Sequence, residues 1–392
     1  MHNIEERIGR ALDSFHIELP SWGFSNTGTR FGKYLQAEAA TRIEEKFADA
    51  GMVQSLTGCC PTLALHVLWD LPGGESDAAK ILDLAAKHGI RPGSINPNLF
   101  ERQEYKFGSI CNPDQAVRKL ALDHLLESVR ISKKLGSRDT SLWVADGSNY
   151  PGSQDIRKRI GWMADALAAT HAELAPDQRM LVEYKPFEPA FYHTDIADWG
   201  MALLLAKQAG PKAAVLVDTG HHYQGQNIEQ IVAWLLREGR LAGFHFNDRR
   251  YADDDLTLGS IDPYQVFRVF HELLSGEEGL SEVAFMVDQS HNLKGKMEAM
   301  VQTVCTAQEL FAKAVCVDRE ELAELQSHCR LVEAEECLRR GFWLDVRPII
   351  RTWRKQRGLP EDPLTALRES GYVERIRAER GEANSRSVWS YA

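Results

Sequence analysis

The segment HFNDRRYADDD, residues 245–255, is the strongest candidate for chemistry because it contains one histidine and four aspartates. It continues the apolar segment LAGFHF, so the acidic run begins where a buried strand is expected to end. Three other apolar segments end in the same way, at Glu183 in VEYKP, Asp218 in VDTGHH and Asp288 in MVDQSHN. Carboxylates and an imidazole at the ends of core elements are typical ligands of a divalent cation.

Glu183, Asp218, His245 and Asp288 stand at or near the ends of consecutive apolar runs, so all four are expected at the same edge of a sheet. Neighbouring strands lie about 4.8 Å apart, which lets four such side chains converge. Three carboxylates without a cation would repel one another and raise their own pKa values. A single carboxylate at a strand end is more often a helix N-cap or a surface charge. The set of four instead predicts a site for Mn²⁺, Mg²⁺ or Co²⁺.

A second group of possible ligands lies beside the first. His221 follows Asp218 by three residues, and Asp253 and Asp255 lie two residues apart in the acidic run. Residues two apart in an extended segment point the same way, so this pair of carboxylates could hold one ion together with the His221 imidazole. The acidic run therefore predicts a second metal ion next to the one that His245 binds. Asp248 and Asp254 are expected to be solvated charges or supporting groups.

Aromatic and polar residues at other strand ends indicate the kind of substrate. His66, Trp69, Trp143 and Lys185 all follow apolar runs, and Lys185 lies two residues beyond Glu183. Aromatic rings beside polar groups suit a sugar, whose C–H faces pack on the rings while its hydroxyls take hydrogen bonds. Core packing is the alternative explanation for each tryptophan, and an ordinary ion pair is the alternative for Lys185.

Short apolar segments alternate with amphipathic stretches along the first 310 residues. The amphipathic stretches, such as DAAKILDLAAKHG, have helical spacing, and several end at a glycine. Eight strands alternating with helices predict an α/β fold, a (β/α)₈ TIM barrel whose active site lies at the C-terminal ends of the strands. A doubly wound sheet is disfavoured because no Gly-rich phosphate loop follows the first strand. The predicted strands are 18–24, 62–69, 90–96, 140–147, 179–186, 213–220, 241–248 and 282–289.

Residues 311–392 lack this alternation and predict a helical C-terminal extension beyond a barrel of residues 1–310. We expect the extension to serve in oligomerisation. The alternative is a cap that closes the barrel's own surface.

The composition limits the possible partners. The chain has 392 residues, of which 44% are hydrophobic and 26% charged, as in ordinary globular proteins. Its net charge of −10 argues against a nucleic-acid or anionic membrane surface. The segment MHNIEERIGRALDSF lacks the basic start and apolar middle of a signal peptide, so a cytoplasmic location is expected. The seven cysteines have no CxxC spacing and are expected to be free thiols.

Several segments match one family in order along the chain. They are PSWGFSNTGTRFGKY, LHVLWD, LWVADGSNYPG, EYKPFEPAFYHT, VDTGHH, GFHFNDRRYADDD with IDPYQVF, and MVDQSHN. Together they resemble the bacterial L-rhamnose isomerases of the broad-specificity type, which are xylose-isomerase-like TIM-barrel sugar isomerases. The resemblance runs from about residue 18 to about residue 380. It departs from the family after Tyr34 and in the final tail, which concerns the sugar preference more than the chemistry.

The resemblance implies a metal-dependent aldose–ketose isomerase, assembled as a homotetramer, that converts L-rhamnose to L-rhamnulose and accepts other aldoses. It implies two divalent ions per subunit, with Mn²⁺ preferred and Co²⁺, Mg²⁺ or Zn²⁺ as alternatives. Glu183, Asp218, His245 and Asp288 look like ligands of the structural metal, and His221, Asp253 and Asp255 like those of the catalytic metal. His66, Trp143, Lys185 and Ser290 resemble the substrate-pocket residues, and Phe31 resembles an aromatic that reaches a neighbouring subunit's active site.

Isomerisation moves hydrogen between C1 and C2 of the sugar, and two divalent ions can polarise both oxygens as Lewis acids. The transfer is either a hydride shift or a proton transfer through an enediol, with Asp288 or its bound water as the candidate base.

Three other functions are possible. A metal-dependent ketose 3-epimerase uses a similar barrel, but the Asp253 and Asp255 pair argues against it. An endonuclease for abasic DNA is disfavoured by the negative charge. A sugar-binding protein without catalysis would not need the ligands of two metal ions, so the two predicted ligand sets argue against this function.

Overall fold

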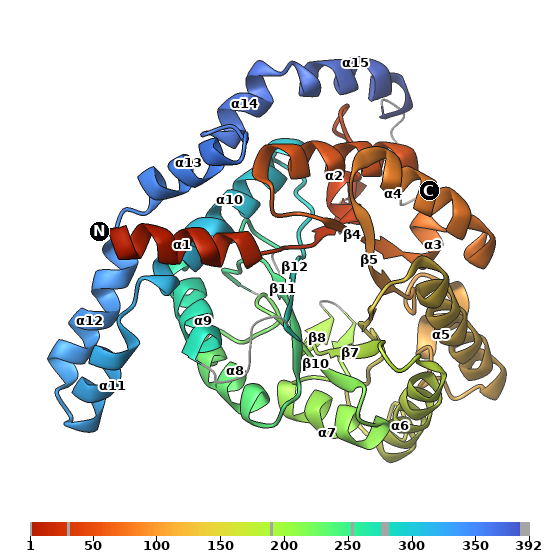
Figure 1. Cartoon of the computed structure of the whole chain (residues 1–392). Helices are drawn as coiled ribbons and strands as arrows, with labels where there is room; N and C mark the ends of the chain where they lie inside the picture. Colours follow the sequence, from red (N-terminus) through yellow and green to blue (C-terminus); the bar gives the residue numbers. More distant parts are fainter. Residues whose placement is uncertain (1, 30–31, 189–190, 252–254, 276–281, 385–392) are drawn as a thin grey trace.

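The computed structural model describes residues 2–29, 32–188, 191–251, 255–275 and 282–384. Eight parallel strands form one sheet in the order β1-β4-β5-β6-β7-β10-β11-β12. Glu18, just before β1, forms a parallel bridge with Met286 of β12, which closes the sheet into a barrel (Figure 1). The barrel strands are β1 (Leu19–Pro20), β4 (Thr62–His66), β5 (Arg91–Asn96), β6 (Asp139–Leu142), β7 (Arg179–Glu183), β10 (Ala213–Asp218), β11 (Leu241–Phe246) and β12 (Ala284–Val287).

A helix on the outside of the barrel follows each strand, so the predicted (β/α)₈ fold is confirmed (Figure 1). Glycines in the left-handed region end several of these helices, as at Gly58, Gly89 and Gly136. Aspartate side chains cap the starts of others, as Asp114 and Asp155 do. The ring consists of α2 (Ile43–Thr57), α4 (Ala78–His88), α5 (Gln115–Leu135), α6 (Ile156–Glu173), α7 (Trp199–Ala209), α8 (Ile228–Arg237), α9 (Pro263–Ser275) and α10 (Lys296–Val315).

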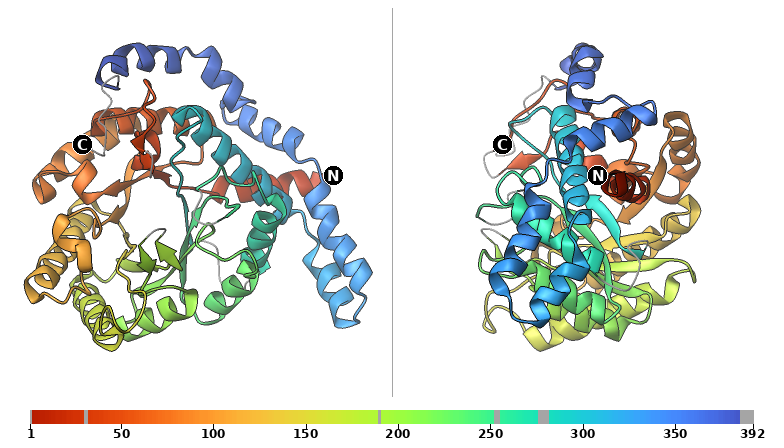
Figure 2. Two further views of the ribbon diagram at one scale, coloured as in Figure 1. Left: turned by 180° about the vertical axis from the view of Figure 1, so that it is seen from behind. Right: turned by 60° about the vertical axis from the view of Figure 1, so that its left-hand side comes forward.

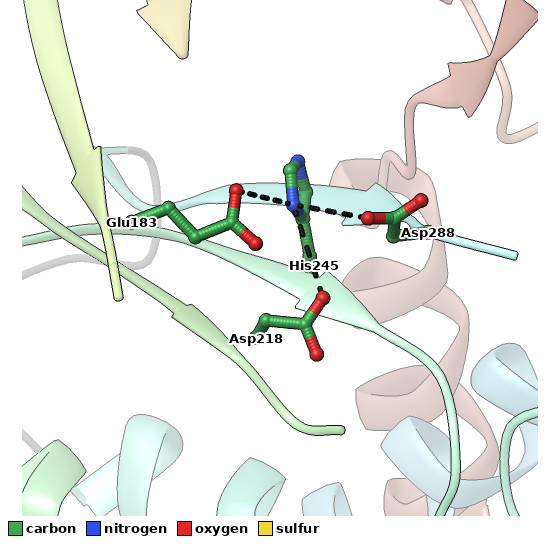
Figure 3. Close-up of side chains that lie close together, drawn as sticks. All are labelled: Glu183, Asp218, His245 and Asp288. Carbon is green, nitrogen blue, oxygen red and sulfur yellow. Dashed lines mark ion pairs between the residues drawn. The ribbon is translucent and has the colours of Figure 1, made fainter. Parts of the chain in front are cut away.

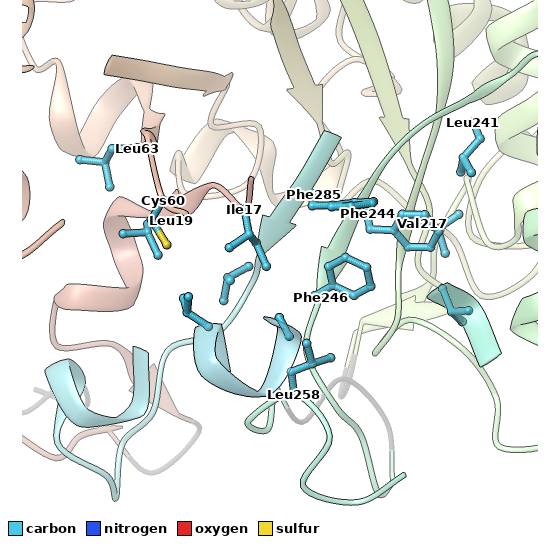
Figure 4. Close-up of a cluster of buried hydrophobic side chains, with 14 of the residues drawn as sticks. Ile17, Leu19, Cys60, Leu63, Val217, Leu241, Phe244, Phe246, Leu258 and Phe285 are labelled. Carbon is cyan, nitrogen blue, oxygen red and sulfur yellow. The ribbon is translucent and has the colours of Figure 1, made fainter. Parts of the chain in front are cut away.

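The main hydrophobic core lies between the strands and the helices that surround them. Phe244, Phe246 and Phe285 pack there with ring centroids 5.0–6.4 Å apart (Figure 4). A second, smaller cluster contains Leu181 and Leu216 and is fully buried. Close packing of this core restricts the movement of the strand backbones, and it thereby fixes the positions of the residues at the strand ends.

Most of the strands end before the predicted residue, and in two of them helical turns replace the last residues. The segment 18–24 forms β1 and then the 3₁₀ helix η1 (Ser21–Phe24), and the segment 62–69 forms β4 and then α3 (Val67–Asp70). Apolar runs of this length do not by themselves distinguish strand from helix. The turns place Trp22 and Trp69 on helical segments at the C-terminal end of the barrel.

The predicted helical C-terminal extension is present. It consists of α11 (Arg319–Ser327), α12 (Leu331–Trp343), α13 (Arg347–Gln356), α14 (Pro363–Glu369) and α15 (Tyr372–Asn384). These helices run along the outside of the barrel, and α15 lies near α2 (Figures 1 and 2). The seven cysteines are free thiols, as predicted. Among the described residues, no helix has both the length and the apolar character that crossing a bilayer requires.

A buried ion pair fastens α15 to the barrel. Arg380 of α15 donates two hydrogen bonds to the carboxylate of Asp49 on α2, at 2.8 and 2.9 Å. Tyr372 also donates to Asp49, at 2.7 Å. Further along, the Asn384 amide donates to the carbonyl oxygens of Ala37 and Ala39, in the loop that follows β1. The last described helix is therefore connected to a loop at the C-terminal end of the barrel strands.

Replacement of Arg380 by alanine should destabilise the protein by about 3–5 kcal/mol, because it leaves the buried Asp49 carboxylate without its cation. Chemical denaturation measures this loss. Arg377 provides the matched control on the same helix, since its side chain is 55% exposed and lies 3.6 Å from Glu38. Arg377→Ala should change the free energy of unfolding by less than about 1 kcal/mol. Equal effects of the two substitutions would contradict the structural role of the buried pair.

Candidate metal centre and substrate cavity

The strand register explains why the four predicted ligands converge. Asp218 of β10 pairs with His245 of β11, and His245 pairs with Met286 of β12. Asp288 lies two residues beyond Met286, so its side chain is on the same face. Glu183 of β7 pairs with Leu216, two residues before Asp218. All four side chains therefore point to the interior at the C-terminal end of the barrel.

These four residues form one compact cluster, with a ligand atom of each lying within 4.8 Å of those of the others. Nδ1 of His245 lies 3.3 Å from Oε2 of Glu183, 3.6 Å from Oδ2 of Asp288 and 4.0 Å from Oδ2 of Asp218 (Figure 3). The nitrogen is buried, and within the described residues it has no directed hydrogen bond. A ring nitrogen facing three carboxylates in this way has the arrangement of ligands around a divalent cation.

Burial and the neighbouring charges shift the pKa values of three of the cluster's residues. Burial alone would lower the pKa of His245, but the three carboxylates raise it to about 9. Burial raises the pKa of Asp218 to about 7, and Glu183 and Asp288 add to the shift. Burial also acts to raise the pKa of Glu183, yet His245 and His221 hold it at about 2. A proton on His245 offsets part of the repulsion among the three carboxylates, and a divalent cation would offset more of it.

Two residues that the sequence analysis did not single out hold these carboxylates in place. The amide of Asn247 donates to both oxygens of Asp218, at 3.0 and 3.1 Å. The indole N–H of Trp22 donates to Oδ1 of Asp288 at 2.8 Å. Asn247 stands two residues after His245, and this spacing was the available signal for its position. Nothing in the sequence connects Trp22 with Asp288, which is 266 residues away.

Of the predicted second group of ligands, the structure describes His221 and Asp255. Nδ1 of His221 lies 3.0 Å from the carbonyl oxygen of Tyr184, so this nitrogen carries the proton, and in the neutral ring Nε2 carries the lone pair. Asp255 lines the same cavity as His221 and has a φ of 47°, a left-handed conformation that is uncommon outside glycine. Such conformations concentrate at functional sites. Asp253 lies outside the described residues.

A cavity of about 210 Å³ opens beside the cluster. Three polar groups in its wall are buried and have no hydrogen-bond partner within the described residues, namely Nδ1 of His66, Oγ of Ser141 and Nε1 of Trp143. Buried polar groups are normally hydrogen-bonded, so these three atoms are available to hydrogen-bond water or a polar ligand in the cavity. Burial lowers the pKa of His66 to about 3, which keeps this imidazole neutral at physiological pH. Ser141 was not predicted, because it stands inside an apolar run.

Aromatic rings form the rest of the wall. Trp69 stacks on His66 with the ring centroids 3.8 Å apart, and Phe100 packs against Trp143 at 5.0 Å. Lys185 lies over the ring of Trp143 at 5.0 Å, and its Nζ forms an ion pair with Glu188 at 2.9 Å. The predicted pocket residues His66, Trp69, Trp143 and Lys185 thus line one cavity.

Of the two remaining predicted residues, only Ser290 is described, and it is not among the residues that line the cavity. Its hydroxyl hydrogen-bonds with that of Thr27 at 3.0 Å and accepts from Lys296 at 3.2 Å. Phe31 lies outside the described residues.

Another cluster with possible metal ligands contains Cys111, Asp146 and Asp195. Here the positive charge comes from an arginine of the protein. The buried Arg159 guanidinium forms an ion pair with Asp195 at 2.7 Å. Asp146 accepts hydrogen bonds from the backbone N–H groups of Ser109 and Cys111. The protein's own groups thus satisfy these carboxylates.

The fold and the site define the general class, a TIM barrel with a buried cluster of three carboxylates and a histidine, compatible with a divalent metal, at the C-terminal ends of its strands. The model of the family described as "Xylose isomerase-like TIM barrel" matches residues 27–277. The chain belongs to this family.

Two curated relatives cover nearly the whole chain. A probable sugar isomerase of Rhizobium meliloti is 40% identical over 383 residues, which is 96% of this chain and 88% of the relative. A probable sugar isomerase of Mesorhizobium japonicum is 38% identical over 384 residues, with the same coverage.

Solved structures with low sequence identity share the fold. An L-ribulose 3-epimerase has a TM-score of 0.56 at 14% identity and covers 80% of this chain and 98% of its own. A xylose isomerase domain protein of Alicyclobacillus acidocaldarius has a TM-score of 0.55 at 17% identity, with 77% of this chain and 99% of its own covered. These similarities support the barrel fold.

Proposed function

We propose that the protein is a metal-dependent aldose–ketose isomerase, with L-rhamnose as its principal substrate and other aldoses accepted. One observation carries the proposal, the buried Nδ1 of His245 facing the carboxylates of Glu183, Asp218 and Asp288. The relatives named as probable sugar isomerases support the reaction class. The choice of L-rhamnose rests on the resemblance of the motifs.

The donor set fits the metal that this function requires. Three carboxylates and one imidazole are hard and borderline ligands, which suit Mn²⁺, Mg²⁺ or Co²⁺. His221 and Asp255, with Asp253, would hold a second ion, and the hydrogen bond from Nδ1 of His221 to the Tyr184 carbonyl is the support that metal-ligating histidines usually have. When bound, the ions supply Lewis acidity toward the two sugar oxygens between which hydrogen moves.

The protein's own groups would bind and orient the sugar. His66, Ser141 and Trp143 have buried polar atoms available for hydroxyl groups. Trp69 and Phe100 offer aromatic faces for C–H groups and exclude water from the cavity. Neutral His66 can both donate and accept a hydrogen bond, so it can bind a hydroxyl without adding charge.

We also propose that the chain assembles as a homotetramer and that the extension contributes to the contacts. Leu331 and Val332 at the start of α12 and Trp343 at its end are 68–73% exposed, and exposed large apolar side chains favour a protein interface.

The test of the function is a chelation and substrate assay. Protein treated with EDTA should lose isomerase activity and regain it with Mn²⁺ or Co²⁺. Ketose formation is measured with L-rhamnose, L-lyxose, L-mannose, D-allose and D-ribose. Full turnover by verified metal-free protein would refute the metal requirement.

The same assay separates the competing activity. A ketose 3-epimerase, suggested by the fold neighbours, would convert ketoses to their C3 epimers and leave aldoses unchanged. Epimer formation from D-allulose or L-ribulose without any aldose conversion would overturn the isomerase proposal.

A further inference from the structure

The two oxygens of Asp288 have different surroundings. Oδ1 accepts the indole N–H of Trp22 at 2.8 Å. Oδ2 faces the cluster, at 3.6 Å from Nδ1 of His245 (Figure 3). Trp22 itself lines the substrate cavity, and its ring meets that of His66 edge-on with centroids 6.2 Å apart. One tryptophan therefore touches both the candidate metal centre and the cavity.

We propose that Trp22 is a positioning residue, whose indole N–H holds Oδ1 of Asp288 so that only Oδ2 is presented to the divalent cation. The inference rests on the metal-binding function proposed above. A carboxylate can bind a metal through one oxygen or both, and it can rotate between the two modes. The hydrogen bond engages one oxygen and fixes the plane of the carboxylate, so the cation meets a ligand that is already oriented.

The segment that carries Trp22 is held firmly enough for this role. The hydroxyl of Ser21 donates to Oδ2 of Asp70, and Asp70 forms a buried ion pair with Lys46 of α2 at 2.6 Å. Oδ2 of Asp70 also accepts the backbone N–H of His66 at 2.7 Å. Asp70 thus connects η1, α2 and the end of β4 through buried contacts, and the backbone beside Trp22 has a fixed place.

The backbone of η1 at Gly23 packs tightly against the segment that carries Asp288. A Cβ atom added at Gly23 would lie 2.9 Å from the carbonyl oxygen of Gln289, which only glycine avoids. The Ser290 hydroxyl donates to the carbonyl oxygen of Trp22 at 3.4 Å. Trp22 and Asp288 therefore approach each other through backbone as well as side chain, which fixes the distance between the indole and the carboxylate.

Trp69 is a matched control within the same cavity. Its indole N–H also donates to a carboxylate at 2.8 Å, but the acceptor is Glu101, which lies outside the cluster. Replacing either tryptophan by phenylalanine keeps an aromatic ring and removes the N–H. Only the substitution at Trp22 removes a hydrogen bond to a candidate metal ligand.

The experiment measures Mn²⁺ affinity in the full-length protein by competition with a chromophoric chelator, without substrate. Trp22→Phe should weaken Mn²⁺ binding about 10–100-fold, which is typical for loss of a group that orients a ligand. Trp69→Phe should leave the affinity unchanged. Unaltered affinity of the Trp22→Phe protein, or equal loss in both variants, would overturn the inference. A melting curve of each metal-free variant verifies that it is folded.

Ser21→Ala provides a second route if Trp22→Phe does not fold. It releases η1 from Asp70 and keeps the indole, so Mn²⁺ affinity should fall by a smaller factor than 10–100. Unchanged affinity in this variant would then overturn the inference. Failure of the proposed function has a different signature, because the wild-type protein itself would bind no Mn²⁺, and the role of Trp22 would fall with it.

Discussion

Replacement of Asp255 by asparagine should reduce kcat by on the order of 10²–10³-fold while leaving the melting temperature nearly unchanged. Asp255 lines the cavity beside His221 and belongs to the proposed catalytic ligand set. Asparagine tolerates the left-handed backbone at this position, where φ is 47°, so the variant removes the charge without adding strain. Steady-state kinetics with L-rhamnose and a thermal melt measure the two effects.

Asp262 supplies the matched control in the same loop region. Its carboxylate accepts the backbone N–H of Gln265 at the start of α9, and asparagine keeps that acceptor. Asp262→Asn should therefore leave both kcat and the melting temperature close to those of the wild type. A wild-type kcat in Asp255→Asn would remove Asp255 from the catalytic ligand set. A large fall in its melting temperature would instead indicate a structural role.

Replacement of Asp218 by asparagine should lower Mn²⁺ affinity by more than about 100-fold and abolish turnover, yet raise the stability of the metal-free protein at pH 8. Burial raises the pKa of Asp218 to about 7. Its ionisation therefore costs the folded state stability, and this cost appears as the pH rises from about 4 to about 7. The neutral amide removes the cost, and it keeps an oxygen that can accept from Asn247.

The difference in melting temperature between the wild type and the Asp218→Asn variant should depend on pH. Well below pH 4, Asp218 is protonated in both the folded and the unfolded state, so the wild type and the variant should melt at similar temperatures. At pH 8 the metal-free variant should melt higher, whereas added Mn²⁺ should stabilise only the wild type. A metal-free variant that is less stable at pH 8 would show that the charged carboxylate stabilises the metal-free fold, and unchanged Mn²⁺ affinity would remove Asp218 from the ligand set.

Asp146 is the control for burial. It is also a buried aspartate near a strand end, and burial raises its pKa, but its partners are backbone N–H groups and Arg159. Asp146→Asn should leave Mn²⁺ affinity unchanged.

The sequence alone determined the barrel and the edge at which the three carboxylates and the histidine converge. Apolar runs alternating with amphipathic helices identified all eight strands, and the residues that end the runs of β7, β10, β11 and β12 form the observed cluster. This succeeded because the position of a side chain at the end of a parallel strand depends on local features, namely the strand's length and its two-residue periodicity. The family motifs then indicated the substrate class through His66, Trp143 and Lys185.

Only the tertiary structure decided which groups support those ligands. Trp22 reaches Asp288 because η1 replaces the end of the first predicted strand, and apolar spacing does not encode that turn. Arg380 reaches Asp49 from 331 residues away. Ser141 lines the cavity because of how the strands pack around it, which its place in an apolar run does not reveal. Ligands at strand ends follow from local periodicity, whereas their supports depend on contacts between distant segments, which exist only once the barrel has closed.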